Sequence, residues 1–405
     1  MLGHVAEKVI ALVIITVLAR HVDRERLGEF LLAISVCTAV AVVSEFGTAR
    51  YVTRTISQDP GRGAETLAAV LRFRLPLLAL ALVLVDVVVA FVAPKQAWTF
   101  ALVSVYVLLE NLYFVFGAAL LAGRAVATRV WTGLVGPVTL LAGVPAALLL
   151  EARFEHVLVL YALSSVLMVV TGFAAARRRF GPIPVVKSTA PVRHIVGQCS
   201  LIFAVNIVVL MHARLDEWML AWLRDFSEVA GYATAYKLAE VSRTVIRPLS
   251  MVLVPVFAAA ALTAPFAQVQ AQARRALALA AAAGVAVAIV VIAVAPALVP
   301  LLFGSEYADS VAITRVLFLA TPALFVGYIA LMFASALVRD AQTLAIAAAC
   351  LGLNFLLNLI AIPRWGGLGA AWTTLASESL FCVAMLVLLL HRPRTAPAPL
   401  PAGSP

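Results

Sequence analysis

The residues best placed to do chemistry are four charged side chains inside one apolar stretch, 229–258: Lys237, Glu240, Arg243 and Arg247. At about 100° of rotation per residue, they fall within about 120° of one helix face. Arg243 lies near the middle of the stretch. A face with three basic groups and one acid suits binding of a pyrophosphate or an acidic sugar, because arginine makes forked contacts to such groups. The alternative is a structural network in which Glu240 pairs with Lys237 or Arg243, while Arg247 extends toward the headgroups.

Two further basic residues, Arg50 and Arg214, are candidates for the same basic site. Arg214 is followed by Asp216 and Glu217, so an internal ion pair and a substrate contact are both open for it. Ionisable groups in the middle of a bilayer cost roughly 2.5–3.5 kcal/mol each on insertion scales. They are therefore expected to face a polar cavity or a partner.

Acids and amides within other apolar stretches have a different set of expected roles. Glu110, Glu378 and Glu240 are candidates for ion coupling, with a helix-helix hydrogen bond as the alternative for the first two. The amides are more simply hydrogen bonds between helices than ligands of a substrate; they are Asn206, Asn354 and Asn358.

The elements that must position these residues are membrane-spanning helices. Apolar residues make up 64% of the 405 positions and charged residues 12%, whereas soluble domains have about 45–50% and 25%. A span needs about 20 apolar residues, and the apolar stretches predict an all-α integral membrane protein with about twelve spans. They lie near 1–20, 27–49, 70–93, 97–122, 126–150, 156–176, 195–222, 229–258, 274–302, 311–336, 341–362 and 368–390.

The distribution of Lys and Arg predicts the orientation. Seventeen of these residues fall on one side of the predicted spans and seven on the other, and cytoplasmic loops retain positive charge. Both termini and the linker 177–194 are therefore predicted to be cytoplasmic. The predicted parts are six-helix bundles at 1–176 and 195–391 and a disordered Pro/Ala-rich tail at 392–405.

The two predicted bundles also resemble each other in sequence. Ala19-Arg20 followed by Gly28 recurs as Leu223-Arg224 followed by Gly231, and the stretch from Ala119 to Arg124 resembles that from Ala334 to Arg339. Six spans per half give both halves one orientation, with a cavity expected between them. Alternating access is the mechanism that this arrangement predicts.

Several classes of function are disfavoured by what the sequence lacks. The basic residues are scattered at the ends of apolar stretches, which argues against a nucleic-acid partner. No nucleotide-binding P-loop, HExxH, GxSxG or Asp-x-Asp motif is present, so we expect no catalytic residue, metal or cofactor. The cysteines are expected to be small core residues; they are Cys37, Cys199, Cys350 and Cys382.

A set of short motifs carries a family resemblance over nearly the whole chain. It comprises Ala19-Arg20 to Gly28-Glu29-Phe30, Glu45-Phe46-Gly47, Ala230-Gly231-Tyr232, Ala235 to Glu240, Leu302 to Tyr307, Asn354 to Asn358 with Ile362-Pro363, and Gly366 to Ala371. The set resembles the polysaccharide biosynthesis proteins that flip undecaprenyl-linked oligosaccharides such as O-antigen. These belong to the multidrug/oligosaccharidyl-lipid/polysaccharide exporter superfamily, with the multidrug and toxin extrusion (MATE) antiporters.

The resemblance implies a MATE-like pair of bundles with a basic central cavity and no enzymatic step. The expected function is therefore a flippase for undecaprenyl-pyrophosphate-linked oligosaccharide in the bacterial cytoplasmic membrane, used in surface polysaccharide or lipopolysaccharide synthesis. Membrane lipids and a glycan polymerase complex are the expected partners. The alternatives are a cation-coupled antiporter, which would favour an acidic pocket, and a membrane polymerase or ligase, which would favour a large outer loop. The family usually has residues ahead of the first span, so the start at Met1 is open.

Overall fold

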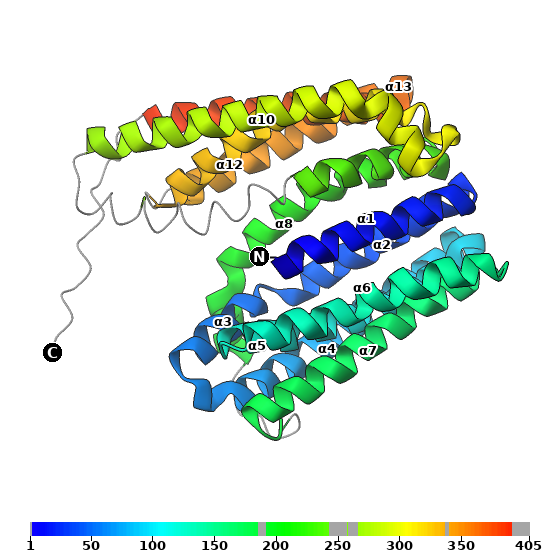
Figure 1. The fold of residues 1–405 in the computed structure, drawn as a ribbon. Helices are drawn as coiled ribbons and strands as arrows, with labels where there is room; N and C mark the ends of the chain where they lie inside the picture. The colour runs from blue at the N-terminus through cyan, green and yellow to red at the C-terminus, as the bar shows by residue number, and fades with distance from the viewer. Residues whose placement is uncertain (1, 185–191, 243–256, 258–265, 337–339, 391–405) are drawn as a thin grey trace. The chain divides into compact units, whose positions relative to one another are not determined.

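A computed structural model of the chain describes residues 2–184, 192–242, 257, 266–336 and 340–390. All regular structure in these ranges is helical (Figure 1). This agrees with the predicted all-α class, because helices satisfy their own backbone hydrogen bonds inside a bilayer. The chain divides into two compact units, Met1–Ala221 and Trp222–Pro405. The predicted division into bundles at the linker 177–194 stays a prediction.

The first unit contains eight α-helices in its described residues. They are α1 (Leu2–His21), α2 (Arg24–Glu45), α3 (Thr48–Gln58), α4 (Gly63–Val92), α5 (Ala97–Ala122), α6 (Val126–Leu149), α7 (Phe154–Phe180) and α8 (Val192–Leu223, which runs two residues past the unit). The helix α5 packs against α2, α3, α4 and α7, and α1 packs on α6. Central α5 is therefore the helix whose side chains meet most of the unit.

The second unit begins with a helical segment, 226–242. It continues with α10 (Phe266–Phe303), α11 (Ser310–Leu319), α12 (Thr321–Ala336) and α13 (Asp340–Leu390). The helices α10, α12 and α13 run side by side (Figure 1). At Gly366 α13 leaves helical geometry, with φ 54° and ψ −135°, so it consists of two arms.

Each of the twelve predicted spans coincides with helical structure, the eighth only over its described part, 229–242. Eight helices in the described residues are long and apolar enough to cross a membrane. Three details differ from the prediction. The second span ends at Glu45 instead of 49, α4 begins at Gly63 instead of 70, and the tenth span is divided into α11 and α12.

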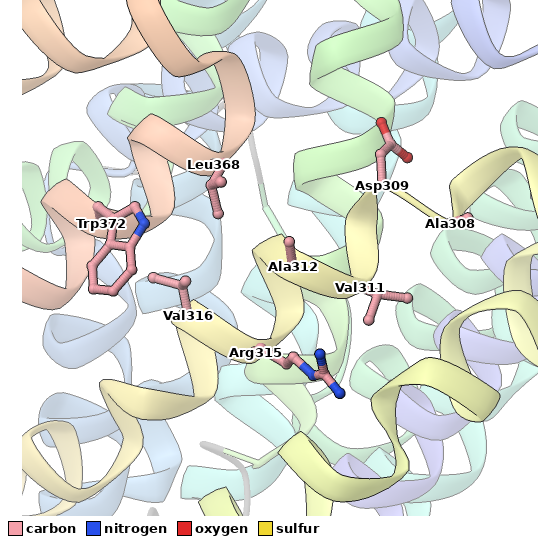
Figure 2. A pocket seen from close by; sticks show the side chains of 8 residues that line it. All are labelled: Ala308, Asp309, Val311, Ala312, Arg315, Val316, Leu368 and Trp372. Carbon is pink, nitrogen blue, oxygen red and sulfur yellow. The ribbon is translucent and has the colours of Figure 1, made fainter.

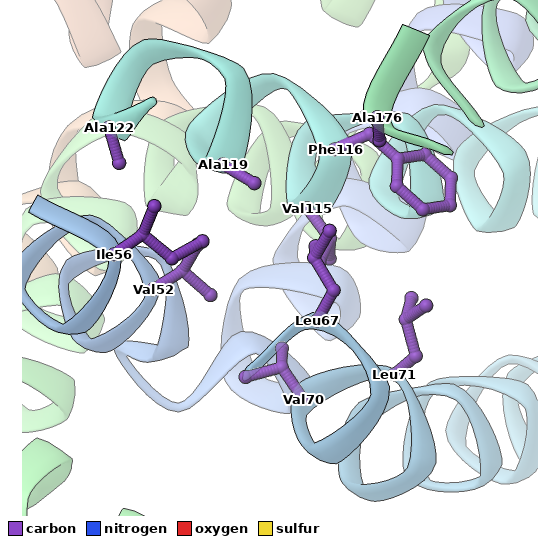
Figure 3. Close-up of a cluster of buried hydrophobic side chains, with 10 residues drawn as sticks. All are labelled: Val52, Ile56, Leu67, Val70, Leu71, Val115, Phe116, Ala119, Ala122 and Ala176. Atoms are coloured by element: carbon purple, nitrogen blue, oxygen red, sulfur yellow. The ribbon is translucent and has the colours of Figure 1, made fainter. Parts of the chain in front are cut away.

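The sequence reasoning missed the short helix α3. It buries Thr48, Val52 and Ile56, which are four residues apart, and exposes Arg54 and Gln58. Its apolar face meets the ends of α4, α5 and α7 in one core cluster (Figure 3). The cluster consists of Val52, Ile56, Leu67, Val70, Leu71, Val115, Phe116, Ala119, Ala122 and Ala176. This helix is too short to span a bilayer, and it closes one end of the unit.

Candidate functional site

Of the four charged residues on the predicted basic face, the structure describes Lys237 and Glu240. Lys237 and Glu240 lie one turn apart on the helical segment 226–242, and the Lys237 Nζ is 2.9 Å from the Glu240 Oε2. Their side chains are 21% and 25% exposed, so the pair is only partly shielded from its surroundings. Arg243 and Arg247 lie outside the described residues. The Lys237 ammonium is therefore already engaged by an acid, as the structural alternative predicted.

Arg214 also has an acidic partner one turn away. Its Nη1 lies 3.2 Å from the Glu217 Oε1 on α8, and the Glu217 side chain is only 3% exposed. Asp216, next to it, is 6% exposed. Of the two open possibilities for Arg214, the structure shows the ion pair. Arg50 lies on α3, and its side chain is outside the described part of the chain.

The two acids proposed for ion coupling lie in different surroundings. Glu110 on α5 is half-buried beside Tyr106 and Tyr161, whose rings meet edge to face with centroids 5.3 Å apart. Glu378 on α13 is 8% exposed and lies near Cys350 and Cys382. Glu110 therefore lies near two tyrosines and Glu378 near two cysteines. The ion-coupling role of both acids stays a prediction.

Asn354 and Asn358 connect the two arms of α13. The Asn354 Nδ2 donates to the Ser377 Oγ at 3.4 Å, and the Asn358 Nδ2 donates to the Asn354 Oδ1 at 3.1 Å. The Thr373 hydroxyl donates to the Asn358 Oδ1. The bonds that involve Ser377 and Thr373 join the two arms, and they are the hydrogen bonds between helices that the sequence predicted. The side chain of Asn206 is outside the described part.

The sequence reasoning missed an ion pair in the first unit. Arg129 on α6 reaches Glu7 on α1, with Nη1 3.3 Å from Oε1, and its Nη1 donates to the Tyr113 hydroxyl at 2.9 Å. The guanidinium carbon lies 5.1 Å from the centre of the Tyr113 ring. Gly133 leaves room for it, since a Cβ there would lie 2.1 Å from the Arg129 Nη1. The sequence feature that could have indicated this pair is the presence of opposite charges, Glu7 and Arg129, one or two turns inside two apolar helices.

A second missed group contains the acid Asp86. The Ser104 hydroxyl on α5 donates to the Asp86 Oδ1 on α4 at 2.8 Å, and the Cys37 Sγ on α2 lies 3.5 Å from the same hydroxyl. Cys37, Cys350 and Cys382 are buried free thiols, as predicted, and Cys199 has no described side chain. A lone Asp in a run of Leu and Val was the available signal.

Two charged side chains hold the kink of α13. The Gly367 N–H donates to the Glu228 Oε2 at 2.8 Å, and the Arg224 Nε donates to the Ile362 carbonyl at 3.1 Å. The Ile362 carbonyl is the one that Gly366 would serve in a regular helix. Glu228 and Arg224 therefore replace the backbone bonds that the kink removes. Arg224 precedes the helical segment 226–242, which bears Lys237 and Glu240, and Glu228 lies within that segment.

A shallow pocket of about 450 Å³ lies on the second unit, near the start of α11 and of the second arm of α13 (Figure 2). Its polar groups are the charged side chains of Asp309 and Arg315 and the indole of Trp372. The pocket is lined by Ala308, Asp309, Val311, Ala312, Arg315, Val316, Leu368 and Trp372.

The arrangement as a whole is one of paired charges and hydrogen bonds inside long apolar helices. Within the described residues, no three His, Cys, Asp or Glu side chains come together as a metal site. The fold and these groups define a multi-pass helical membrane protein, and each unit contains at least one ion pair within its apolar helices.

The family follows from comparison with known sequences. A model of the family described as "Polysaccharide biosynthesis protein" matches residues 1–261. The chain belongs to this family, as the motifs predicted. No protein in a search of curated sequences matches it.

Solved structures show the same fold. One is a lipid II flippase, MurJ, in an inward closed conformation, with a TM-score of 0.74 and 11% identity over 97% of this chain and 87% of that one. Another is an inward-facing multidrug resistance MATE transporter, with a TM-score of 0.71 and 15% identity over 95% and 93%. A third is a transporter of the same superfamily from Pyrococcus furiosus, with a TM-score of 0.64 and 16% identity over 95% and 94%. The predicted MATE-like fold is thus confirmed.

Proposed function

We propose that this protein is a flippase that moves undecaprenyl-pyrophosphate-linked oligosaccharide across the bacterial cytoplasmic membrane during surface polysaccharide synthesis. The observation that carries the proposal is membership of the polysaccharide biosynthesis protein family over residues 1–261. The fold adds support, because a flippase of lipid II has it too. No enzymatic step is part of the proposed activity, and a glycan polymerase complex is the proposed recipient of the flipped substrate.

The proposed substrate site is basic and consists of Arg243, Arg247, Lys237, Arg214 and Arg50. Two of these have acidic partners, since Lys237 pairs with Glu240 and Arg214 pairs with Glu217. Such pairs hold a cation in place between transport events. A pyrophosphate with its higher charge competes with a single carboxylate for the cation. Transport then requires exposure of this site to one side of the membrane and then the other.

The experiment compares surface glycan display with the membrane abundance of variants in a deletion strain. Arg243→Ala is expected to abolish display at normal abundance, and Arg243→Lys to restore it only in part, because the fork is lost. Lys95→Ala is the matched control, since Lys95 is an exposed basic residue in the short helix Pro94–Gln96 outside the predicted spans. Normal display from Arg243→Ala at normal abundance would contradict the proposed basic site.

The pair of Lys237 and Glu240 separates substrate binding from structural pairing. If the pair is structural, Lys237→Ala lowers abundance and the double change Lys237→Ala with Glu240→Ala restores both abundance and display. If Lys237 binds substrate, the double change restores abundance while display stays low. The second result is the one that the proposal expects.

A cation-coupled antiporter is the second candidate, because a MATE transporter shares the fold over 95% of this chain. In that case Glu110, Glu378 and Glu240 would couple ion entry to substrate exit. The deletion strain distinguishes the two functions. Loss of surface glycan with unchanged drug tolerance supports the flippase, and the reverse supports the antiporter.

A further inference from the structure

One end of the first unit contains arginines from three separate segments of the chain. Arg62 directly precedes α4, Arg124 follows the end of α5, and the last turn of α7 contains Arg177, Arg178 and Arg179. All five side chains are exposed. The rule that cytoplasmic loops retain positive charge accounts for each segment by itself. Whether the five arginines form one surface depends on how α4, α5 and α7 pack.

The ring of Phe180, the last residue of α7, brings the three segments together. A Cβ on Gly63, the first residue of α4, would overlap the Phe180 ring, and a Cβ on Gly123, the residue after α5, would lie 2.8 Å from the Phe180 Cζ. Both glycines therefore contact one aromatic ring, and a larger residue at either position would displace it. Arg62 and Arg124 are the chain neighbours of these glycines, so their backbones lie beside the end of α7.

Arg179 joins α7 to the end of α5 by two hydrogen bonds. Its Nη2 donates to the Gly123 carbonyl at 2.9 Å, and its Nε donates to the same carbonyl at 3.2 Å. An arginine has five N–H groups, so these two bonds leave three for other acceptors on an exposed side chain. The carbon of the Gly123 carbonyl is bonded to the Arg124 nitrogen. The Arg179 guanidinium is therefore held directly beside the Arg124 backbone.

The acids in these segments do not neutralise the arginines. The stretches 53–66, 119–126 and 173–184 contain two acids, Asp59 and Glu65, and six arginines, the sixth being Arg54 on α3, which leaves a net charge of +4. The Asp59 carboxylate accepts the Gly61 N–H at 3.0 Å. The Glu65 Oε2 lies 3.9 Å from the Arg62 Nε, and both side chains are about half exposed, so this ion pair is weak. The surface therefore keeps an excess of positive charge.

Exposed apolar side chains lie close to the same arginines. Leu121 and Val126, which flank Arg124, are 48% and 53% exposed, and Phe173, one turn before Arg177, is 39% exposed. In a membrane protein such side chains face hydrocarbon, so arginines about one turn further along lie at the level of the headgroups. An acidic protein partner would not require this apolar border. The border therefore favours a lipid as the ligand.

We propose that the arginine surface, defined as Arg62, Arg124, Arg177, Arg178 and Arg179, binds the headgroups of anionic phospholipids of the surrounding bilayer. Clusters of four to eight basic residues beside membrane helices attract anionic lipid in this way. Because α4, α5 and α7 end together at the Phe180 ring, a lipid bound here contacts all three helix ends. On the predicted topology this is the cytoplasmic leaflet. The inference is independent of the proposed glycan transport, since the lipid is a resident and not the cargo.

The test is native mass spectrometry of the purified full-length protein mixed with phosphatidylglycerol, with phosphatidylethanolamine of the same acyl chains, or with both. The wild-type protein is expected to retain phosphatidylglycerol better by at least fivefold, because each arginine near an anionic headgroup contributes a factor of about five. The double variant Arg124→Gln with Arg178→Gln should lower retention of phosphatidylglycerol by roughly twentyfold. It should leave phosphatidylethanolamine unchanged. Arg124→Lys with Arg178→Lys should keep most of the retention, since the charge remains.

Arg26→Gln with Arg153→Gln is the matched control, because these are exposed arginines at the starts of α2 and α7, at the other end of the unit. It should leave retention unchanged. The test variants keep the bonds from Arg179 to Gly123, so they are expected to fold. Unchanged retention of phosphatidylglycerol in the Arg124→Gln and Arg178→Gln variant, or an equal loss in the control, would overturn the proposal.

Two competitors distinguish other sources of the same phosphate chemistry. Displacement of phosphatidylglycerol by equimolar glycerol 3-phosphate would overturn the proposal, since the ligand would then be a soluble phosphate. Stronger retention of undecaprenyl phosphate than of phosphatidylglycerol would overturn it too, since the surface would then belong to the carrier lipid. Retention of phosphatidylglycerol in the presence of either competitor is the expected result.

Discussion

The connection between the last two predicted spans of each half is built differently in the two units. In the first unit α6 ends and α7 begins across the loop 150–153. That end of α6 is closed by backbone bonds alone, from the Ala152 N–H to the Ala147 carbonyl at 3.0 Å and from the Glu151 N–H to the Leu148 carbonyl at 3.1 Å. In the second unit the corresponding connection is the kink of α13. It is held by Glu228 and Arg224, more than 130 positions earlier in the chain.

The difference indicates which of the two connections depends on residues elsewhere in the chain. A helix end that closes on its own backbone depends on local residues only. The α13 kink is held by Arg224, just before the segment 226–242, and by Glu228 within it, so it depends on the position of that segment. Because the segment 226–242 bears Glu228 as well as Lys237 and Glu240, we expect a change at this ion pair to affect the α13 kink through one helix. We expect substitutions at the α13 kink to have larger and more distant effects than substitutions at 150–153.

The largest expected effect is that of Gly366→Ala. The φ of 54° with a ψ of −135° is a conformation for glycine, and an added Cβ would lie 2.5 Å from the Glu228 Oε1. Such strain costs about 1–3 kcal/mol, and displacement of the Glu228 carboxylate adds a similar amount. Loss of most folded protein in detergent is expected, measured by fluorescence-detected size exclusion after heating. Gly352→Ala is the control on the same helix, because nothing lies within 4 Å of its Cβ position.

An intermediate effect is expected for Glu228→Ala. It leaves the Gly367 N–H without its acceptor, at a cost of about 1.5–3 kcal/mol for a hydrogen bond to a charged group. Glu228→Gln should recover part of the lost melting temperature, since the amide oxygen still accepts. Glu155→Ala is the comparison in the first unit, as Glu155 is the acid in the first turn of α7, and a change of only a few tenths of a kcal/mol is expected. Equal losses at both positions would show that the α13 kink is no more dependent on side chains than the loop 150–153.

The smallest effect has the opposite sign. Glu151 has a φ of 54°, a left-handed conformation that glycine adopts without a Cβ penalty. Glu151→Gly is therefore expected to raise stability by roughly 0.5–1 kcal/mol, seen as a higher melting temperature. Glu155→Gly, inside helical structure, should instead lower stability by about 1 kcal/mol. A lower melting temperature for Glu151→Gly would mean that the loop 150–153 depends on contacts of the Glu151 side chain.

The sequence indicated the charged residues and the ion pairs within one helix, but not the ion pair between residues that are distant in the chain. The charge pattern identified Lys237, Glu240 and Arg214, and the structure pairs Lys237 with Glu240 and Arg214 with Glu217 over one turn of helix each. Neighbours at that spacing follow from helix geometry alone. The pair of Glu7 and Arg129 was missed, because these residues are 122 positions apart and meet only where α1 packs on α6.

The sequence by itself determined the fold class and the approximate helices. Hydropathy acts on each segment separately, since about 20 apolar residues cross a bilayer whatever their neighbours are. Helix ends within the chain were less certain, and α3 was missed because its apolar face repeats every four residues in a segment that is polar overall. Only the tertiary structure decided that Glu228 and Arg224 hold the α13 kink. It also decided that the Arg315 Nε donates to the Ile292 carbonyl of α10, which lacks its helical donor because Pro296 has no N–H. These bonds join separate segments, and an unsatisfied backbone group binds whichever side chain the packing brings within reach.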